Sequence, residues 1–162
     1  MSFVTDLDNP APPLPEGAAD PAAPIAGDWW PDIDPARIRT AYRIREAVTH
    51  DRLREALIAA IITVGNDLAD WQADQLAAGH AALAAIPAPR IDGESRLLLC
   101  YRRAVALYAK AEIVERYRDI DLTGPGERRA EDLDPSIGEL RRDALHAVRD
   151  LLGRTRTMVD LI

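Results

Sequence analysis

The rarest residue types of this chain exclude much of the usual chemistry of protein sites. Its 162 residues include one cysteine and three histidines. A single cysteine excludes an internal disulfide, and because Cys100 lies in an apolar, helical run we expect a small buried side chain and not a nucleophile. His50, His80 and His146 have no second histidine or cysteine three or four residues away, so the local spacing of a zinc site is absent.

Sequence motifs for catalysis are missing too. The chain has no glycine-rich phosphate-binding loop, no GxSxG turn and no HExxH helix. Pairs of carboxylates are frequent, but 27 acidic residues on helical surfaces produce such pairs by chance. We therefore predict that the chain is not an enzyme and that it has no catalytic, cofactor-binding or metal-binding residues.

One segment, DIDLTGPGERRAED at residues 119–132, begins like a calcium-binding loop. It has carboxylates at its first and third positions and Gly124 at its sixth. Loops of this type need a bidentate Glu at the twelfth position. Ala130 occupies that position, and Arg128 and Arg129 would bring two positive charges toward the ion. We predict a turn that connects two helices.

Basic residues are absent from the first 30 positions, which contain five acids. The whole chain has 27 acidic and 20 basic residues and a net charge of -7, so it lacks the charge expected of a protein that neutralises nucleic-acid phosphates. All of its bases except Lys110 are arginines, which a coding preference explains most simply. Because no signal peptide or apolar run of membrane length is present, we expect a cytoplasmic protein without membrane contact.

Three regions differ in composition. Residues 1–30 are rich in proline and acid, which predicts a flexible or extended arm. Residues 31–153 have the apolar periodicity of a helical domain, and residues 154–162 form an apolar tail. Trp29 and Trp30 close the arm. Exposed tryptophans are costly, so we favour packing on the body, with contact to a partner as the alternative.

The first half of the body predicts two helices. Asp34 as N-cap and Pro35 at the first helical position begin a short amphipathic helix that runs to about Ala47. Thr49 is the expected N-cap of a second helix, of about 30 residues, that ends at Gly79. Such a length suggests a bundle.

The second half predicts two more helices. One runs from residue 94 or 95 to about residue 119. Ser136 and Glu139 form a capping box for the last helix, which Gly153 stops. The predicted fold class is all-α: a bundle of about four helices with two long central ones, an extended N-terminal arm and an extended C-terminal tail.

Two further features have no explanation from the fold. Asp67, Asp70 and Asp74 lie on one face of the long second helix without a base among them. A solvated face is the simplest interpretation, and a surface for a partner's arginines or for DNA is the alternative. The tail is too apolar for a free end, so we expect these four residues to dock on this subunit or on another: Met158, Val159, Leu161 and Ile162.

Five stretches of the chain resemble the head-completion proteins of contractile-tailed temperate phages, in the same order and up to the last residue. They are DWWPDI (28–33), AVTHDRLREAL (47–57), ERYRDIDL (115–122), GERRAEDL (126–133) and RTRTMVDLI (154–162). The arm before Asp28 lies outside these stretches.

The resemblance implies a structural protein of the phage neck. Such a protein joins the portal after DNA packaging, forms a ring that matches the portal's symmetry (dodecameric when assembled), retains the DNA and offers a platform for the tail. The implied partners are the portal protein, other neck or tail-completion proteins and further copies of the chain, with only passing contact to the packaged DNA. The implied location is the head-tail junction of the virion, after a period in the host cytoplasm.

The resemblance also gives the unexplained features a role. Asp67, Asp70 and Asp74 become candidates for a channel lining. The candidates for contact with the portal or a neighbouring subunit are Trp29, Trp30, Arg128, Arg129, Arg154, Arg156, Met158, Val159, Leu161 and Ile162. A small helical regulatory or protein-binding module of a prophage is the alternative function. A nucleic-acid-binding regulator that uses the arginines of the first helix is a third, which the acidic total disfavours.

Overall fold

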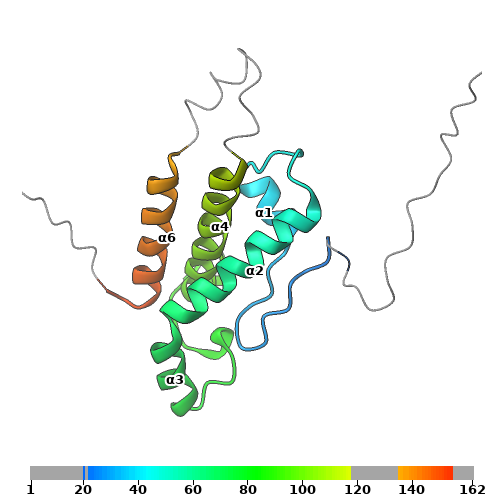
Figure 1. Ribbon diagram of the computed structural model, residues 1–162. Coiled ribbons are helices and arrows are strands. Elements are labelled where there is room, and N and C mark those ends of the chain that lie inside the picture. The colour runs from blue at the N-terminus through cyan, green and yellow to red at the C-terminus, as the bar shows by residue number, and fades with distance from the viewer. Residues whose placement is uncertain (1–19, 21, 118–134, 155–162) are drawn as a thin grey trace, which may run out of the picture.

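The computed structural model describes residues 20, 22–117 and 135–154, and this part of the chain is mainly helical (Figure 1). Its α-helices are α1 (Pro35–Ala41), α2 (His50–Asp67), α3 (Ala69–Ala77), α4 (Arg96–Tyr117) and α6 (Ile137–Leu151). A 3-10 turn, η1 (Leu83–Ala85), and two short strands, β1 (Arg90–Ile91) and β2 (Glu94–Ser95), connect α3 to α4. The predicted all-α class is confirmed.

The helix α4 is central to the arrangement. It packs against α6 on one side and against α2 on the other, and α2 crosses it obliquely (Figure 1). Among the residues that the structure describes, α4 and α2 are the longest helices, with 22 and 18 residues.

The first helix begins as predicted but ends early. The Asp34 carboxylate accepts hydrogen bonds from the backbone N–H groups of Ala36 and Arg37 and so caps α1. The expectation that this helix reaches Ala47 is wrong, because it stops at Ala41.

A side chain explains why α1 ends there. The Arg39 guanidinium donates to the carbonyl oxygens of Arg45 and Val48, at 2.8 and 2.7 Å, and so holds the following segment in a turn. Arg43 takes a positive φ of 52° within this turn. The backbone closes the helix at the same place, because the Ile44 N–H donates to the carbonyl oxygen of Arg39 at 3.0 Å and the Arg43 N–H to that of Thr40 at 3.4 Å.

The predicted 30-residue helix is broken at Leu68. Thr49 caps its start and Gly79, with φ +90°, follows its end, as expected. Between them, Leu68 leaves the helical conformation (φ -107°, ψ 4°) and separates α2 from α3. The three residues before the break, Gly65–Asn66–Asp67, are poor helix formers, which is the local reason for it.

A two-residue hairpin precedes α4. Asp92 and Gly93 connect β1 to β2 with positive φ angles of 50° and 77°, the backbone of a type I′ turn. The Arg102 guanidinium of α4 donates to both carboxylate oxygens of Glu94 at 2.9 Å and so fastens the hairpin to the helix. Arg102 also lowers the pKa of the Glu94 carboxyl, chiefly through this hydrogen bond.

The last helix, α6, was predicted correctly at both ends. The Ser136 hydroxyl accepts from the Glu139 N–H, and the Glu139 carboxylate accepts from the Ser136 N–H, which forms the capping box. Hydrogen bonds from the Ser136 backbone N–H and then from the Ser136 side chain lower the pKa of the Glu139 carboxyl. Gly153 has a φ of +67° after the helix end.

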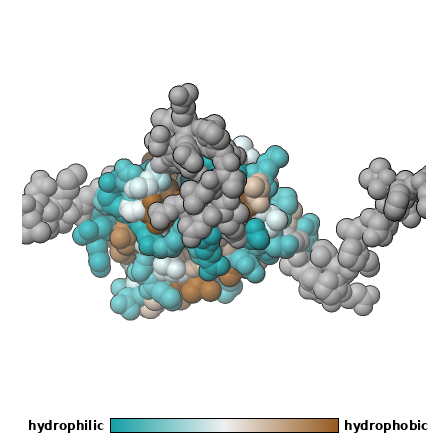
Figure 2. Space-filling model, turned by 45° about the horizontal axis from the view of Figure 1, so that its top comes forward, coloured by the Kyte–Doolittle hydropathy of each residue, from teal (hydrophilic) through white to brown (hydrophobic). Residues whose placement is uncertain are grey.

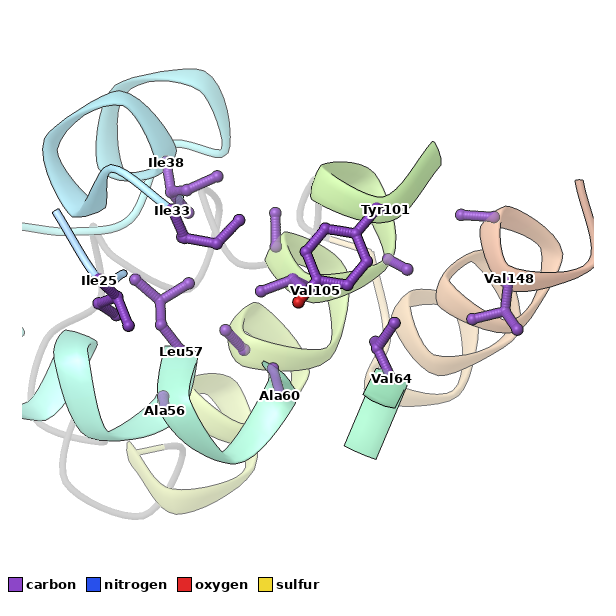
Figure 3. Packing of buried hydrophobic residues seen from close by; sticks show 14 of the residues in the cluster. Ile25, Ile33, Ile38, Ala56, Leu57, Ala60, Val64, Tyr101, Val105 and Val148 are labelled. Carbon is purple, nitrogen blue, oxygen red and sulfur yellow. The ribbon is translucent and has the colours of Figure 1, made fainter. Parts of the chain in front are cut away.

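The core lies where α2 and α6 meet α4. Leu57 and Val64 of α2, Tyr101 and Val105 of α4 and Val148 of α6 point toward one another (Figure 3). All five are buried. A smaller cluster between α4 and α6 contains Leu107, Ala111, Leu140 and Ala144.

Candidate assembly surfaces

The N-terminal segment that precedes α1 is part of the folded body. Ile25 and Ile33 exchange two backbone hydrogen bonds of 2.8 and 3.0 Å, and both side chains are buried in the core. Within this loop a side chain at Gly27 would collide with the backbone carbonyl of Trp30. Ile25 thus joins the body that we expected to begin at residue 31.

The two tryptophans of this segment anchor it. Trp29 is buried, its indole N–H donates to the carbonyl oxygen of His80 at 3.0 Å, and its ring meets Trp71 of α3 edge-on. The Trp30 ring stacks on Tyr101 of α4 with 4.7 Å between ring centroids and 5° between ring planes. Packing on the body was the favoured interpretation, and the structure shows these contacts. Contact of the half-buried Trp30 with a partner stays a prediction.

The break at Leu68 divides the predicted stripe of carboxylates. Asp70 and Asp74 lie one turn apart on α3 and are exposed, whereas Asp67 ends α2. The Asp67 carboxylate accepts a hydrogen bond from the Tyr108 hydroxyl of α4, and the pKa of Tyr108 is raised by burial and by this carboxylate. Only Asp70 and Asp74 therefore remain as an uninterrupted acidic pair, and a channel-lining role for the three stays a prediction.

The described residues offer little for catalysis. They contain no group of three His, Cys, Asp or Glu side chains that is able to hold a metal ion. Cys100 is half-buried, and burial raises the pKa of its thiol, so the reactive thiolate is disfavoured. A dent between α2 and α4, lined by Arg52, Glu55, Glu112 and Arg116 among others, has a volume of about 10 Å³, enough for one water molecule.

None of the helices in the described part of the chain is both long and apolar enough to span a bilayer. The surface drawn in Figure 2 mixes hydrophilic and hydrophobic residues.

The side of α2 that faces away from the core is partly apolar. Ile58 and Ile62 lie one turn apart, and 40% and 58% of their surfaces are exposed. At 100° per residue, Asp51 and Glu55 fall on the same side of the helix, and Glu55 lies at its edge, where it also lines the dent toward α4. We call these four residues the α2 outer face.

The side of α6 that faces away from the core has the opposite charge. Leu145 is 48% exposed, with Arg142 three residues before it and Arg149 four residues after it on the same side of the helix. Arg142 also contacts the carboxylate of its neighbour Asp143 at 3.0 Å. We call Arg142, Leu145 and Arg149 the α6 outer face.

Sequence reasoning missed both outer faces because it followed only the buried apolar stripe of each helix. The signal was present in α2, where Leu57, Ile58, Ile61 and Ile62 make the helix apolar on both sides. Exposed apolar side chains opposite the buried stripe of a helix indicate a second surface that can be buried.

Several predicted contact residues lie outside the described residues: Arg128, Arg129, Arg156, Met158, Val159, Leu161, Ile162 and the whole segment 119–132. Arg154 is described. It is exposed, and its backbone N–H donates to the carbonyl oxygen of Arg149 at 2.9 Å, which closes the C-terminal turn of α6.

Comparison with known proteins gives one consistent result. The family model of the phage head completion protein (GPL) matches residues 25–162. A head completion/stabilization protein of Escherichia phage P2 is 37% identical over 149 residues, which cover 92% of this chain and 88% of that protein. A probable head completion/stabilization protein of Haemophilus phage HP1 is 28% identical over 134 residues, which cover 83% and 88%. No solved structure matches the chain.

The P2 match is longer than the sequence stretches indicated. It covers 92% of this chain and therefore extends into the arm before Asp28, which we had placed outside the resemblance.

Proposed function

Because this chain belongs to the phage head completion protein (GPL) family, we propose that it forms a ring on the portal vertex of a filled phage head. In this position the ring retains the packaged DNA and presents the platform to which the tail attaches. The family is a structural one, and the coarser role of a virion protein that completes the head follows from membership alone.

The observation that carries this proposal is the extent of the likeness. The identity to the P2 protein is 37% over 92% of the chain, and the family model matches residues 25–162. The body supports it as well, because a compact bundle held by α4 is a unit that can be placed side by side with other copies around a channel. A net charge of -7 lets DNA pass without adhering.

We assign the portal contact to the apolar tail. Met158, Val159, Leu161 and Ile162 follow the point where α6 ends, and Arg154 and Arg156 accompany them. Arg128 and Arg129 of the connecting segment are assigned to pairing with a neighbouring subunit, an interaction that gives orientation more than affinity. The half-buried Trp30 is assigned to contact with the portal or a neighbouring subunit.

The first test mixes the purified full chain with portal rings and measures the mass and symmetry of what forms, beside the chain alone. A ring stacked on the portal is the expected result. A folded monomer or dimer that never binds the portal contradicts the proposal.

The second test removes residues 155–162. This deletion keeps Arg154, whose N–H closes α6, so the helical content measured by circular dichroism should stay unchanged. Binding to the portal should be lost. A matched variant keeps the length and replaces only the four apolar tail residues by Ser, and it should lose binding as well. Normal portal binding by the Ser variant would show that the tail packs within its own subunit.

A further inference from the structure

We propose that the α2 outer face of one copy docks on the α6 outer face of the next copy. This inference rests on the proposed ring and names the surfaces that build it. The α2 outer face consists of Asp51, Glu55, Ile58 and Ile62, and the α6 outer face of Arg142, Leu145 and Arg149.

The two faces are chemically complementary. Each has an exposed apolar part, beside which α2 has the carboxylates of Asp51 and Glu55 and α6 has two arginines, of which Arg142 also pairs with Asp143. Opposite charges across an interface steer association and fix its register.

The spacing along the two helices also agrees. Leu145 lies between two arginines, at axial distances of roughly 4.5 and 6 Å from a rise of 1.5 Å per residue. Glu55 lies roughly 4.5 Å before Ile58 by the same measure. When Leu145 packs midway between Ile58 and Ile62, Glu55 lies roughly 7.5 Å from it along α2. Arg149 then comes within roughly 1.5 Å of the level of Glu55 if the helices are antiparallel, and Arg142 within roughly 3 Å if they are parallel.

The complementary charges of two faces on one chain point to a second copy of the chain as the occupant. Because α2 and α6 both bury their inner sides against α4, their outer faces point away from it on different sides of the body (Figure 1). Every copy thus carries both halves of the contact. A heterologous contact of this kind closes into a ring when its rotation fits, whereas a twofold contact stops at a dimer.

The decisive experiment uses cysteines at the two faces. In a Cys100→Ala background, one chain carries Ile62→Cys and another carries Leu145→Cys, and both are added to DNA-filled heads that lack this protein. A short bis-maleimide should join the two chains into dimers in the mixture and should join neither chain to itself. A chain with both cysteines should give a ladder of higher multiples.

Each outcome decides the matter. Dimers of the Ile62→Cys chain alone mean that α2 meets α2, which overturns the inference. If the heads are completed and hold their DNA but none of these cross-links forms, the inference is overturned. The proposed function is not contradicted by that result. Cross-links from either chain to a different head protein assign the faces to that partner and overturn it too. Failure of the unmodified chain to bind heads overturns the proposed function and this inference with it.

Charge variants test the same contact without cross-linking. Ile62→Arg places a cation against the α6 arginines. Because like charges across an interface repel, the dissociation constant for self-association should rise about tenfold. Adding Leu145→Glu in the same chain should restore it. The matched control is Ile91→Arg on β1, since Ile91 is 56% exposed against 58% for Ile62 and lies on neither face. An equal loss in the control would contradict the assignment.

Discussion

Tyr101 joins three parts of the structure. It is fully buried on α4, the Trp30 ring stacks on one side of it, and Val64 and Val105 lie close by (Figure 3). Its hydroxyl is buried and has no hydrogen-bond partner among the described residues. A buried hydroxyl without a partner costs roughly 1–3 kcal/mol, so the ring stabilises the fold while its oxygen opposes it.

Tyr101→Phe should therefore raise the free energy of unfolding, by about 1 kcal/mol at neutral pH, in urea titrations followed by circular dichroism. The control is Tyr108→Phe, which removes a hydroxyl that donates to Asp67 and should lower the free energy of unfolding by about 1 kcal/mol. If Tyr101→Phe were as destabilising as Tyr108→Phe, the Tyr101 hydroxyl would have to be satisfied.

Tyr101→Phe should also change how the stability depends on pH. Burial raises the pKa of Tyr101 in the folded chain above its ordinary value of about 10. Above pH 10 the unfolded chain loses this proton while the folded chain keeps it, so stability falls as the pH rises. The loss of stability between pH 9 and pH 11 should be smaller in Tyr101→Phe than in the natural chain. Parallel curves would contradict a raised pKa.

Helix ends show how far local sequence determines the elements. The caps at Asp34, Thr49 and Ser136 were predictable because a short polar side chain and the following N–H groups form them without help from distant residues. The early end of α1 was not predictable, because the Arg39 guanidinium donates there to carbonyl oxygens of residues six and nine positions later in the chain. The Asp92–Gly93 hairpin was predictable from its turn signal and was missed.

The candidate surfaces were predictable to a smaller extent. The packing of Trp29 and Trp30 follows from the cost of exposing them, but their partners Tyr101 and His80 come from segments that only folding brings near. To predict the outer faces of α2 and α6, one must know which side of each helix is buried against α4.

The two glycines of the α2–α3 region should respond oppositely to one substitution. Gly65 lies inside α2 with open space around its Cβ position, so Gly65→Ala should raise the free energy of unfolding by about 0.5–1 kcal/mol. Gly79 has φ +90° and also open space, so Gly79→Ala should lower it by about 1–2 kcal/mol through backbone strain alone. Thermal unfolding of both variants measures the contrast. Destabilisation by Gly65→Ala would indicate that the break at Leu68 needs the glycine.

At the scale of the whole molecule, different helices have different roles in the proposed ring. In the proposed ring, the outer faces of α2 and α6 contact neighbouring copies. The helix α3 is not used in these contacts, and it has no fully buried residue. Its Asp70 and Asp74 are exposed and face no base on their own helix. The exposed, acidic side of this helix is suited to a surface past which DNA slides.

A charge reversal on α3 tests whether that surface faces the DNA. Asp70→Lys with Asp74→Lys should slow DNA exit from completed heads and raise DNA retention by the isolated ring, because each lysine can hold a phosphate. Asp67 is left unchanged since its carboxylate accepts from Tyr108. Glu46→Lys with Asp74→Lys provides the matched control: it makes the same change in charge with only one lysine on α3, because Glu46 is exposed between α1 and α2. The retained DNA, measured at several salt concentrations, should rise most in the α3 double variant and fall again with salt. Equal retention in both variants would mean that total charge governs the effect and that α3 faces away from the channel.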